Sequence, residues 1–81
     1  MNRTRYARAV AMATAAHAGV FRTGTNVPYI SHPLAVSAMA MEYGGSEDVA
    51  IAAVLHDVVE DAGREYIVPI REEFGPYVAD L

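Results

Sequence analysis

Apolar residues recur at helical spacing along most of the chain, and glycine and proline divide them into short blocks. The first predicted helix covers residues 4–18 and ends at Gly19, and its many alanines are typical of a helix that packs closely against its neighbours. A second helix is predicted over residues 31–43, with Pro33 in its first turn, where a missing backbone N–H does no harm. Gly44 and the glycine that follows it end this helix.

The third predicted helix is the most apolar segment, since nearly every residue from 49 to 59 is hydrophobic. This composition predicts a helix that is buried on most sides. His56 and Asp57, followed by Glu60 and Asp61, come at the C-terminal end of this helix. Carboxylates are unfavourable there because the helix dipole already places negative charge at that end. A locally unfavourable choice at the end of the most buried element points to a functional site.

The remaining pattern concerns helix ends. Ser46 is the predicted N-cap of the third helix, because its hydroxyl can accept a hydrogen bond from the first turn. A fourth helix is predicted over residues 67–74, closed by Gly75, and a fifth begins at Pro76. The chain therefore predicts an all-α fold of four or five short helices around one core. A fifth helix that ends after one turn is typical of an incomplete domain.

Composition excludes several classes of protein. With 81 residues, 53% of them hydrophobic, and no cysteine, the chain has room for one small domain and holds neither a disulfide scaffold nor a cysteine-based zinc ribbon. Six arginines against ten carboxylates give a net charge of −4, which disfavours nucleic acid and acidic membrane surfaces as partners. We expect no membrane span and no signal peptide, and therefore a cytoplasmic protein.

The residues that carry chemistry are His56 and Asp57, together with His32 at the start of the second predicted helix. Imidazole nitrogen and carboxylate oxygen suit a divalent ion such as manganese, iron or zinc. If the third helix continued, Glu60 would lie one turn beyond His56, and Asp61 one turn beyond Asp57. The two acids would then stand where a water activated by the metal needs orienting.

Three segments of the chain carry a family resemblance. Residues 16–33 contain an arginine, a short glycine-containing loop and the run Pro-Tyr-Ile-Ser-His-Pro. Residues 52–61 read Ala-Ala-Val-Leu-His-Asp-Val-Val-Glu-Asp, and residues 70–81 hold a helix followed by a Phe-Gly turn. This combination resembles the HD-domain phosphohydrolases, specifically the alarmone (ppGpp) hydrolase branch typified by the RelA/SpoT hydrolase domain and its small single-domain homologues. A His-Asp pair alone is weak evidence, but the two motifs in this order are specific.

The resemblance implies an all-α, HD-type helical domain that hydrolyses the 3′-pyrophosphate of a guanosine alarmone or a related nucleotide. It also implies a manganese cofactor, although another divalent ion is possible. The residues that it assigns to the site are the metal ligands His32, His56 and Asp57, the catalytic acids Glu60 and Asp61, and the substrate contacts Arg22 and Tyr29.

The chain departs from the family's pattern at two points. Val20 stands where the family often has glutamine. This difference bears on the nucleotide contacts that the resemblance implies, and not on the metal ligands. In the family, a fourth metal ligand is an aspartate in a later helix, and this sequence ends at Leu81 before that helix. Residues 1–81 are therefore expected to be the N-terminal part of an HD metal-dependent phosphohydrolase domain.

Two other interpretations remain open. A truncated, non-catalytic HD-like helical module acting by protein interaction is the main alternative to an enzyme. A homodimer that supplies the fourth ligand from its second copy lies between the two, and it would also help so small a core. His17, on the alanine-rich first helix, is interpreted as a packed or capping histidine and receives no role in the site.

Overall fold

The structure, a computed structural model, describes residues 2–80, so Leu81 lies outside the described residues. Its elements are α1 (Arg3–Ala16), α2 (Ser31–Glu42), α3 (Glu47–Leu55), α4 (Val58–Ala62), the 3₁₀ turn η1 (Arg64–Tyr66), α5 (Ile67–Phe74) and α6 (Pro76–Asp80). Within residues 2–80 no strand forms, and the prediction of an all-α fold is confirmed. None of these helices is long and apolar enough to span a membrane.

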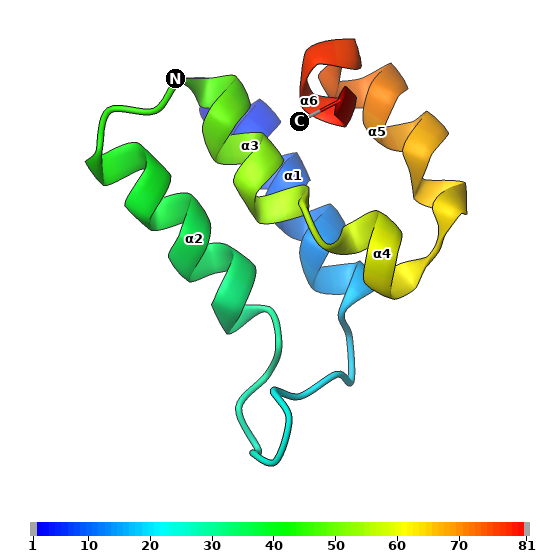
Figure 1. Cartoon of the computed structure of the whole chain (residues 1–81). Helices are drawn as coiled ribbons and strands as arrows, with labels where there is room; N and C mark the ends of the chain where they lie inside the picture. The colour runs from blue at the N-terminus through cyan, green and yellow to red at the C-terminus, as the bar shows by residue number, and fades with distance from the viewer. Residues whose placement is uncertain (1, 81) are drawn as a thin grey trace.

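Helix α3 lies at the centre of the fold, with α2 along one side and α1, α4 and α6 close to it (Figure 1). Ala9 and Ala13 of α1 have no exposed surface, because their small side chains let α1 approach α3 closely. Ile51, Val54 and Val58 are fully buried as well. The core cluster consists of Ala9, Ala13, Ile51, Val54, Leu55, Val58, Ile70, Phe74 and Val78.

Hydrogen bonds from side chains fix how the first three helices pack. Ser37 of α2 is completely buried, and its hydroxyl donates to the Ala50 carbonyl of α3 at 2.8 Å. Because that bond uses the only hydroxyl proton of Ser37, the Tyr6 hydroxyl of α1 must be the donor in the 2.6 Å contact between Tyr6 and Ser37. One buried serine therefore joins α1, α2 and α3.

Arg5 joins α1 to the start of α3 and to the end of α5. Its guanidinium lies 2.6 Å from a Glu47 carboxylate oxygen and 2.8 Å from Asp48, both in the first turn of α3. It also donates to the carbonyl of Phe74 at the end of α5, at 2.5 Å. The backbone N–H of Asn2 and the Arg5 side chain hold the pKa of Glu47 below its ordinary value.

Most predicted helix ends are confirmed. The Ser46 hydroxyl accepts a hydrogen bond from the backbone N–H of Val49 at 3.2 Å, so Ser46 caps α3. Helix α2 ends at Glu42, and Gly44 follows with φ of 84°, a conformation that favours glycine. Helix α5 keeps the predicted bounds and is followed by Gly75 at φ of 94°.

The predicted third helix is divided in two, which corrects the placement of the acids. Helix α3 ends at Leu55, and Asp57, with φ −95° and ψ −5°, is the N-cap of the new helix α4. The His56 side chain bonds to the Ala53 carbonyl, the acceptor that residue 57 would use if α3 continued. The turn also lets Val58 enter the core with no exposed surface. The acids therefore lie in the first turn of α4, where the dipole favours them, and not at the end of α3.

Candidate metal centre

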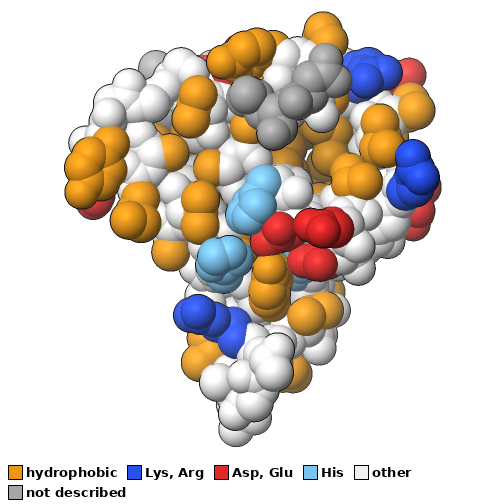
Figure 2. All heavy atoms as spheres, in the orientation of Figure 1, with side chains coloured by type: hydrophobic (Ala, Val, Ile, Leu, Met, Phe, Trp, Pro, Cys, Tyr) orange, Lys and Arg blue, Asp and Glu red, His pale blue; other side chains and the backbone are white. Residues whose placement is uncertain are grey.

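The three predicted metal ligands come from three different elements. His32 is the second residue of α2, His56 directly follows α3, and Asp57 precedes α4. One ligand atom from each residue lies within 4.8 Å of the others. In Figure 2 histidine and acidic side chains gather at the centre of this face of the molecule. The fold thus brings together side chains from both sequence motifs, because α2 packs along α3.

Asp57 is the central member of this group. One of its carboxylate oxygens, Oδ2, lies 3.1 Å from Nε2 of His56 and 3.9 Å from Nε2 of His32. Two ligand atoms that each lie about 2.1 Å from an ion, at right angles, are about 3 Å apart. The Asp57 side chain is 15% exposed, whereas the two imidazoles are close to 40% exposed. The group is therefore spaced for a divalent ion and open to solvent on the imidazole side.

The orientation of His56 also fits metal binding. Its Nδ1 lies 2.6 Å from the carbonyl oxygen of Ala53. A carbonyl oxygen only accepts, so Nδ1 carries a proton, and Nε2 is the ring nitrogen that faces Asp57. Histidines that bind metals commonly donate their second ring N–H to a backbone carbonyl in this way. The donor set and its orientation together fit a divalent cation.

Tyr29 contacts the group from the loop between α1 and α2. Its hydroxyl donates to Oδ2 of Asp57 at 2.7 Å. This hydrogen bond, assisted by burial and by the negative charges of Asp57 and Asp61, raises the pKa of Tyr29 to about 12. The phenol therefore stays protonated at neutral pH and holds the carboxylate in place. The sequence placed Tyr29 in the substrate pocket but did not indicate its contact with Asp57.

The two predicted catalytic acids lie on α4, outside the tight ligand group. Glu60 is exposed to solvent. Asp61 has a side chain that is 43% exposed, and its Oδ2 lies 3.4 Å from Nε2 of His17. Neither acid belongs to the group of three residues that could hold a metal ion, and their catalytic roles stay predictions.

His17 is the residue of this region that the sequence did not assign to the site. The prediction that it packs or caps holds, because it follows α1 directly and only 3% of it is exposed. Its Nδ1 bonds to the Ala13 carbonyl at 3.0 Å, and its ring lies 4.9 Å from the ring of Tyr29. The contact with Asp61 depends on how α1 and α4 pack, and no local sequence signal indicates it.

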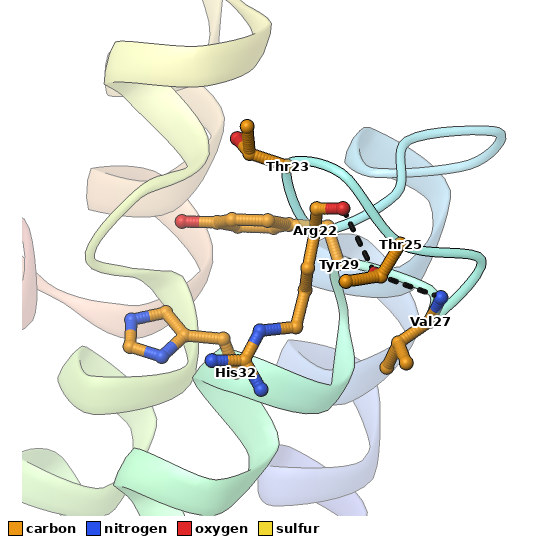
Figure 3. Close-up of a pocket in the computed structure, with 6 residues that line it drawn as sticks. All are labelled: Arg22, Thr23, Thr25, Val27, Tyr29 and His32. Carbon is orange, nitrogen blue, oxygen red and sulfur yellow. Dashed lines mark hydrogen bonds between the residues drawn. The ribbon is translucent and has the colours of Figure 1, made fainter.

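An open pocket of about 480 Å³ adjoins the ligand group. It is within the size range of small-molecule sites. Figure 3 shows Arg22 and Tyr29 projecting from the loop on the side of His32. The complete lining is Arg22, Thr23, Thr25, Val27, Tyr29 and His32. The structure therefore places both predicted substrate contacts in one pocket with a predicted metal ligand.

The loop that carries this pocket is held by its own hydrogen bonds. The backbone N–H of Arg22 donates to the Val27 carbonyl at 2.8 Å, and Phe21 pairs with Pro28 in an isolated bridge. The Thr25 hydroxyl donates to the Arg22 carbonyl at 2.9 Å. These bonds close the loop and fix where the Arg22 side chain leaves the backbone. The threonines of the lining were not predicted from the sequence.

Known proteins with similar sequences are named as a pyrophosphohydrolase, a bifunctional synthase/hydrolase and a pyrophosphokinase. The chain is 39% identical over 66 residues to a guanosine-3′,5′-bis(diphosphate) 3′-pyrophosphohydrolase of Haemophilus influenzae, covering 82% of this chain and 10% of that protein. It is 38% identical over 77 residues to the bifunctional (p)ppGpp synthase/hydrolase SpoT of Escherichia coli, covering 95% and 11%. A probable GTP pyrophosphokinase of Mycobacterium leprae is 42% identical over 74 residues, covering 91% and 9%.

The chain thus spans about a tenth of the length of these relatives. Their similarity extends over most of the chain and agrees with the resemblance of its motifs to alarmone hydrolases. Residues 9–81 match the HD domain family. Because this match includes both histidine motifs and nearly all of the helical core, the chain belongs to the HD domain family.

Proposed function

We propose that this chain provides the metal centre of a phosphohydrolase that removes the 3′-pyrophosphate of guanosine alarmones such as ppGpp. The observation that carries the proposal is the convergence of His32, His56 and Asp57 beside the Arg22 pocket. The names of the similar proteins support the choice of substrate. The reaction adds water across the bond between the 3′ oxygen and phosphorus and yields GDP and pyrophosphate.

His32, His56 and Asp57 are the residues that would hold the divalent ion, with two imidazole nitrogens and one carboxylate oxygen. This mixed donor set suits manganese, which we propose as the cofactor. When bound, such an ion supplies a Lewis acid that polarises a phosphoryl oxygen and makes a water molecule more acidic. Tyr29 keeps the Asp57 carboxylate oriented through its 2.7 Å hydrogen bond.

Glu60 and Asp61 are proposed to orient the attacking water and to accept its proton. Both lie in the first turn of α4, directly after the Asp57 cap. Either carboxylate is a suitable general base, provided that it reaches the water in the substrate complex. The leaving 3′ oxygen gains a proton as its bond to phosphorus breaks.

Arg22 is proposed to bind the phosphates of the nucleotide. Its side chain is exposed in the pocket and, among the residues that the structure describes, forms no ion pair. A guanidinium with five free donors matches phosphate oxygens well. The pocket places this positive charge on the same side as His32.

Three further proposals concern the protein as a whole. Residues 1–81 are proposed to be the N-terminal part of an HD phosphohydrolase domain, because the relatives are about ten times longer. We also propose that the protein acts in the cytoplasm, and that a homodimer can complete the ligand set when the chain is alone. A two-fold symmetric pair is the commonest way for a small chain to do this.

The test is pyrophosphate release from ppGpp by the purified 81-residue chain in the presence of manganese. We expect GDP and pyrophosphate in equal amounts, lost on chelation and in the Asp57→Ala variant. Glu72→Gln, an exposed change on α5, is the matched control and should leave the rate unchanged. A folded chain that binds manganese but releases no pyrophosphate would contradict the proposal and favour a non-catalytic module.

A further inference from the structure

The most deeply buried titratable side chain near the centre is His17, whose side chain is 1% exposed. Burial of an imidazole is unfavourable unless its ring nitrogens are hydrogen-bonded. Both nitrogens of His17 have partners, namely the Ala13 carbonyl at 3.0 Å and the Asp61 carboxylate at 3.4 Å. The mechanism proposed above uses Asp61 but gives His17 no task.

The orientation of the His17 ring is set by contacts other than the one with Asp61. The bond from Nδ1 to Ala13 and the contact with the ring of Tyr29 set its plane, and burial leaves it little freedom to turn. The Ala13 carbonyl lies against Nδ1 of the imidazole, and the Asp61 carboxylate lies against Nε2. The edge of the ring that carries Nε2 is thus directed at Oδ2 of Asp61, 3.4 Å away.

The Asp61 side chain, by contrast, is not fixed by burial. It is 43% exposed, and Asp61 stands on α4, a helix of only five residues. A half-exposed carboxylate on so short an element has several rotamers open to it. The 3.4 Å contact with His17 and an interaction with the Tyr29 hydroxyl restrict this choice.

Two neighbouring rings, tilted by 39° to one another, each contact one carboxylate beside the centre. Tyr29 donates to Asp57, and His17 faces Asp61, while the rings of Tyr29 and His17 lie 4.9 Å apart. We propose that His17 is a positioning residue that orients the Asp61 carboxylate toward the attacking water. This inference rests on the proposed function, in which Asp61 handles that water.

Two substitutions separate the two hydrogen bonds of His17. The amide of asparagine lies near the position of Nδ1, so His17→Asn keeps the bond to Ala13 and loses the one to Asp61. The amide of glutamine lies near the position of Nε2, so His17→Gln keeps a donor for Asp61 and loses the bond to Ala13. A merely structural role predicts that both variants lose activity in proportion to their loss of thermal stability.

A positioning role predicts a different result in steady-state hydrolysis of ppGpp. His17→Asn should lower kcat about 10–100-fold, the usual effect of removing a group that orients a site residue, with KM and manganese affinity unchanged. His17→Gln should restore most of kcat even if it is the less stable of the two. Equal kcat in the two variants, or a loss that appears in KM alone, would overturn the proposal.

A second measurement does not depend on turnover. In nitrogen-15 NMR spectra of the metal-free chain, the Nε2 resonance of His17 should shift in Asp61→Asn and stay in place in Glu60→Gln, the neighbouring control. An Nε2 resonance with the same chemical shift in Asp61→Asn as in the wild type would overturn the proposal. If the wild-type chain releases no pyrophosphate, the proposed function fails, and this resonance alone decides whether His17 holds Asp61.

Discussion

Manganese should stabilise the folded chain strongly, because only folding brings its ligands together. His32 lies on α2, whereas His56 and Asp57 lie between α3 and α4, so an unfolded chain offers no comparable site. A ligand that binds only the folded state at 100 times its dissociation constant adds about 2.7 kcal/mol to the free energy of unfolding. For a domain of this size, each kcal/mol raises Tm by about 4–8 °C, which predicts a rise of about 10–20 °C.

The assay is thermal unfolding followed by circular dichroism, with and without manganese, in three proteins. Asp57→Asn keeps an oxygen that accepts from Tyr29 but removes the negative charge, so it should change the metal-free Tm little and lose most of the manganese effect. Glu72→Gln, an exposed change on α5, should keep the full rise. Two results would refute this prediction: a full manganese-induced rise of Tm in Asp57→Asn, or a wild-type Tm that saturating manganese does not change.

Three further predictions concern the fold. Ser37→Ala leaves the Tyr6 hydroxyl without its acceptor and should lower the free energy of unfolding by about 1–3 kcal/mol in urea denaturation; a double-mutant cycle with Tyr6→Phe that shows no coupling would contradict this. Ile51→Ala should be destabilising by about 2–5 kcal/mol and Ile51→Val by about 0.5–1.5, because Ile51 is fully buried, so equal losses would argue against the described core. The pKa of Glu47 is held below its ordinary value of 4.5 by the Asn2 N–H and by Arg5, so the stability that it contributes is present above pH 4.5 and is lost as pH falls through the lowered pKa. Glu47→Gln should therefore flatten the acid side of the stability profile, and an unchanged profile would argue against the contacts of Glu47 with the Asn2 N–H and Arg5.

The helices that the sequence predicted correctly have local signals at their ends. Gly44, one residue beyond the end of α2, and Gly75, directly after α5, take positive φ values, and Ser46 caps α3 with its own hydroxyl. Each of these signals acts within one turn, so it can be found from neighbouring residues alone. The break between α3 and α4 has no glycine or proline, and Asp57, which precedes α4, makes no side-chain capping hydrogen bond. It depends on the bond from His56 to Ala53 and on the burial of Val58, which are properties of the folded molecule.

The candidate site was predictable where a motif carries it and not where packing creates it. His32 could be joined to His56 only through the family resemblance, since His32 lies on α2 and His56 follows α3. The contacts of Tyr29 with Asp57 and of His17 with Asp61 link segments that are distant in the sequence. Such contacts are set by the packing of α1 and the following loop against α4, which hydrophobic periodicity does not specify.

The central claim is that His32, His56 and Asp57 bind one divalent ion. Its most direct test is anomalous X-ray diffraction from a crystal of the chain grown with manganese. We predict a single strong anomalous peak within bonding distance of Nε2 of both histidines and of Oδ2 of Asp57. A peak elsewhere, such as beside the acidic pair Glu47 and Asp48, or no peak at saturating manganese, would contradict the claim.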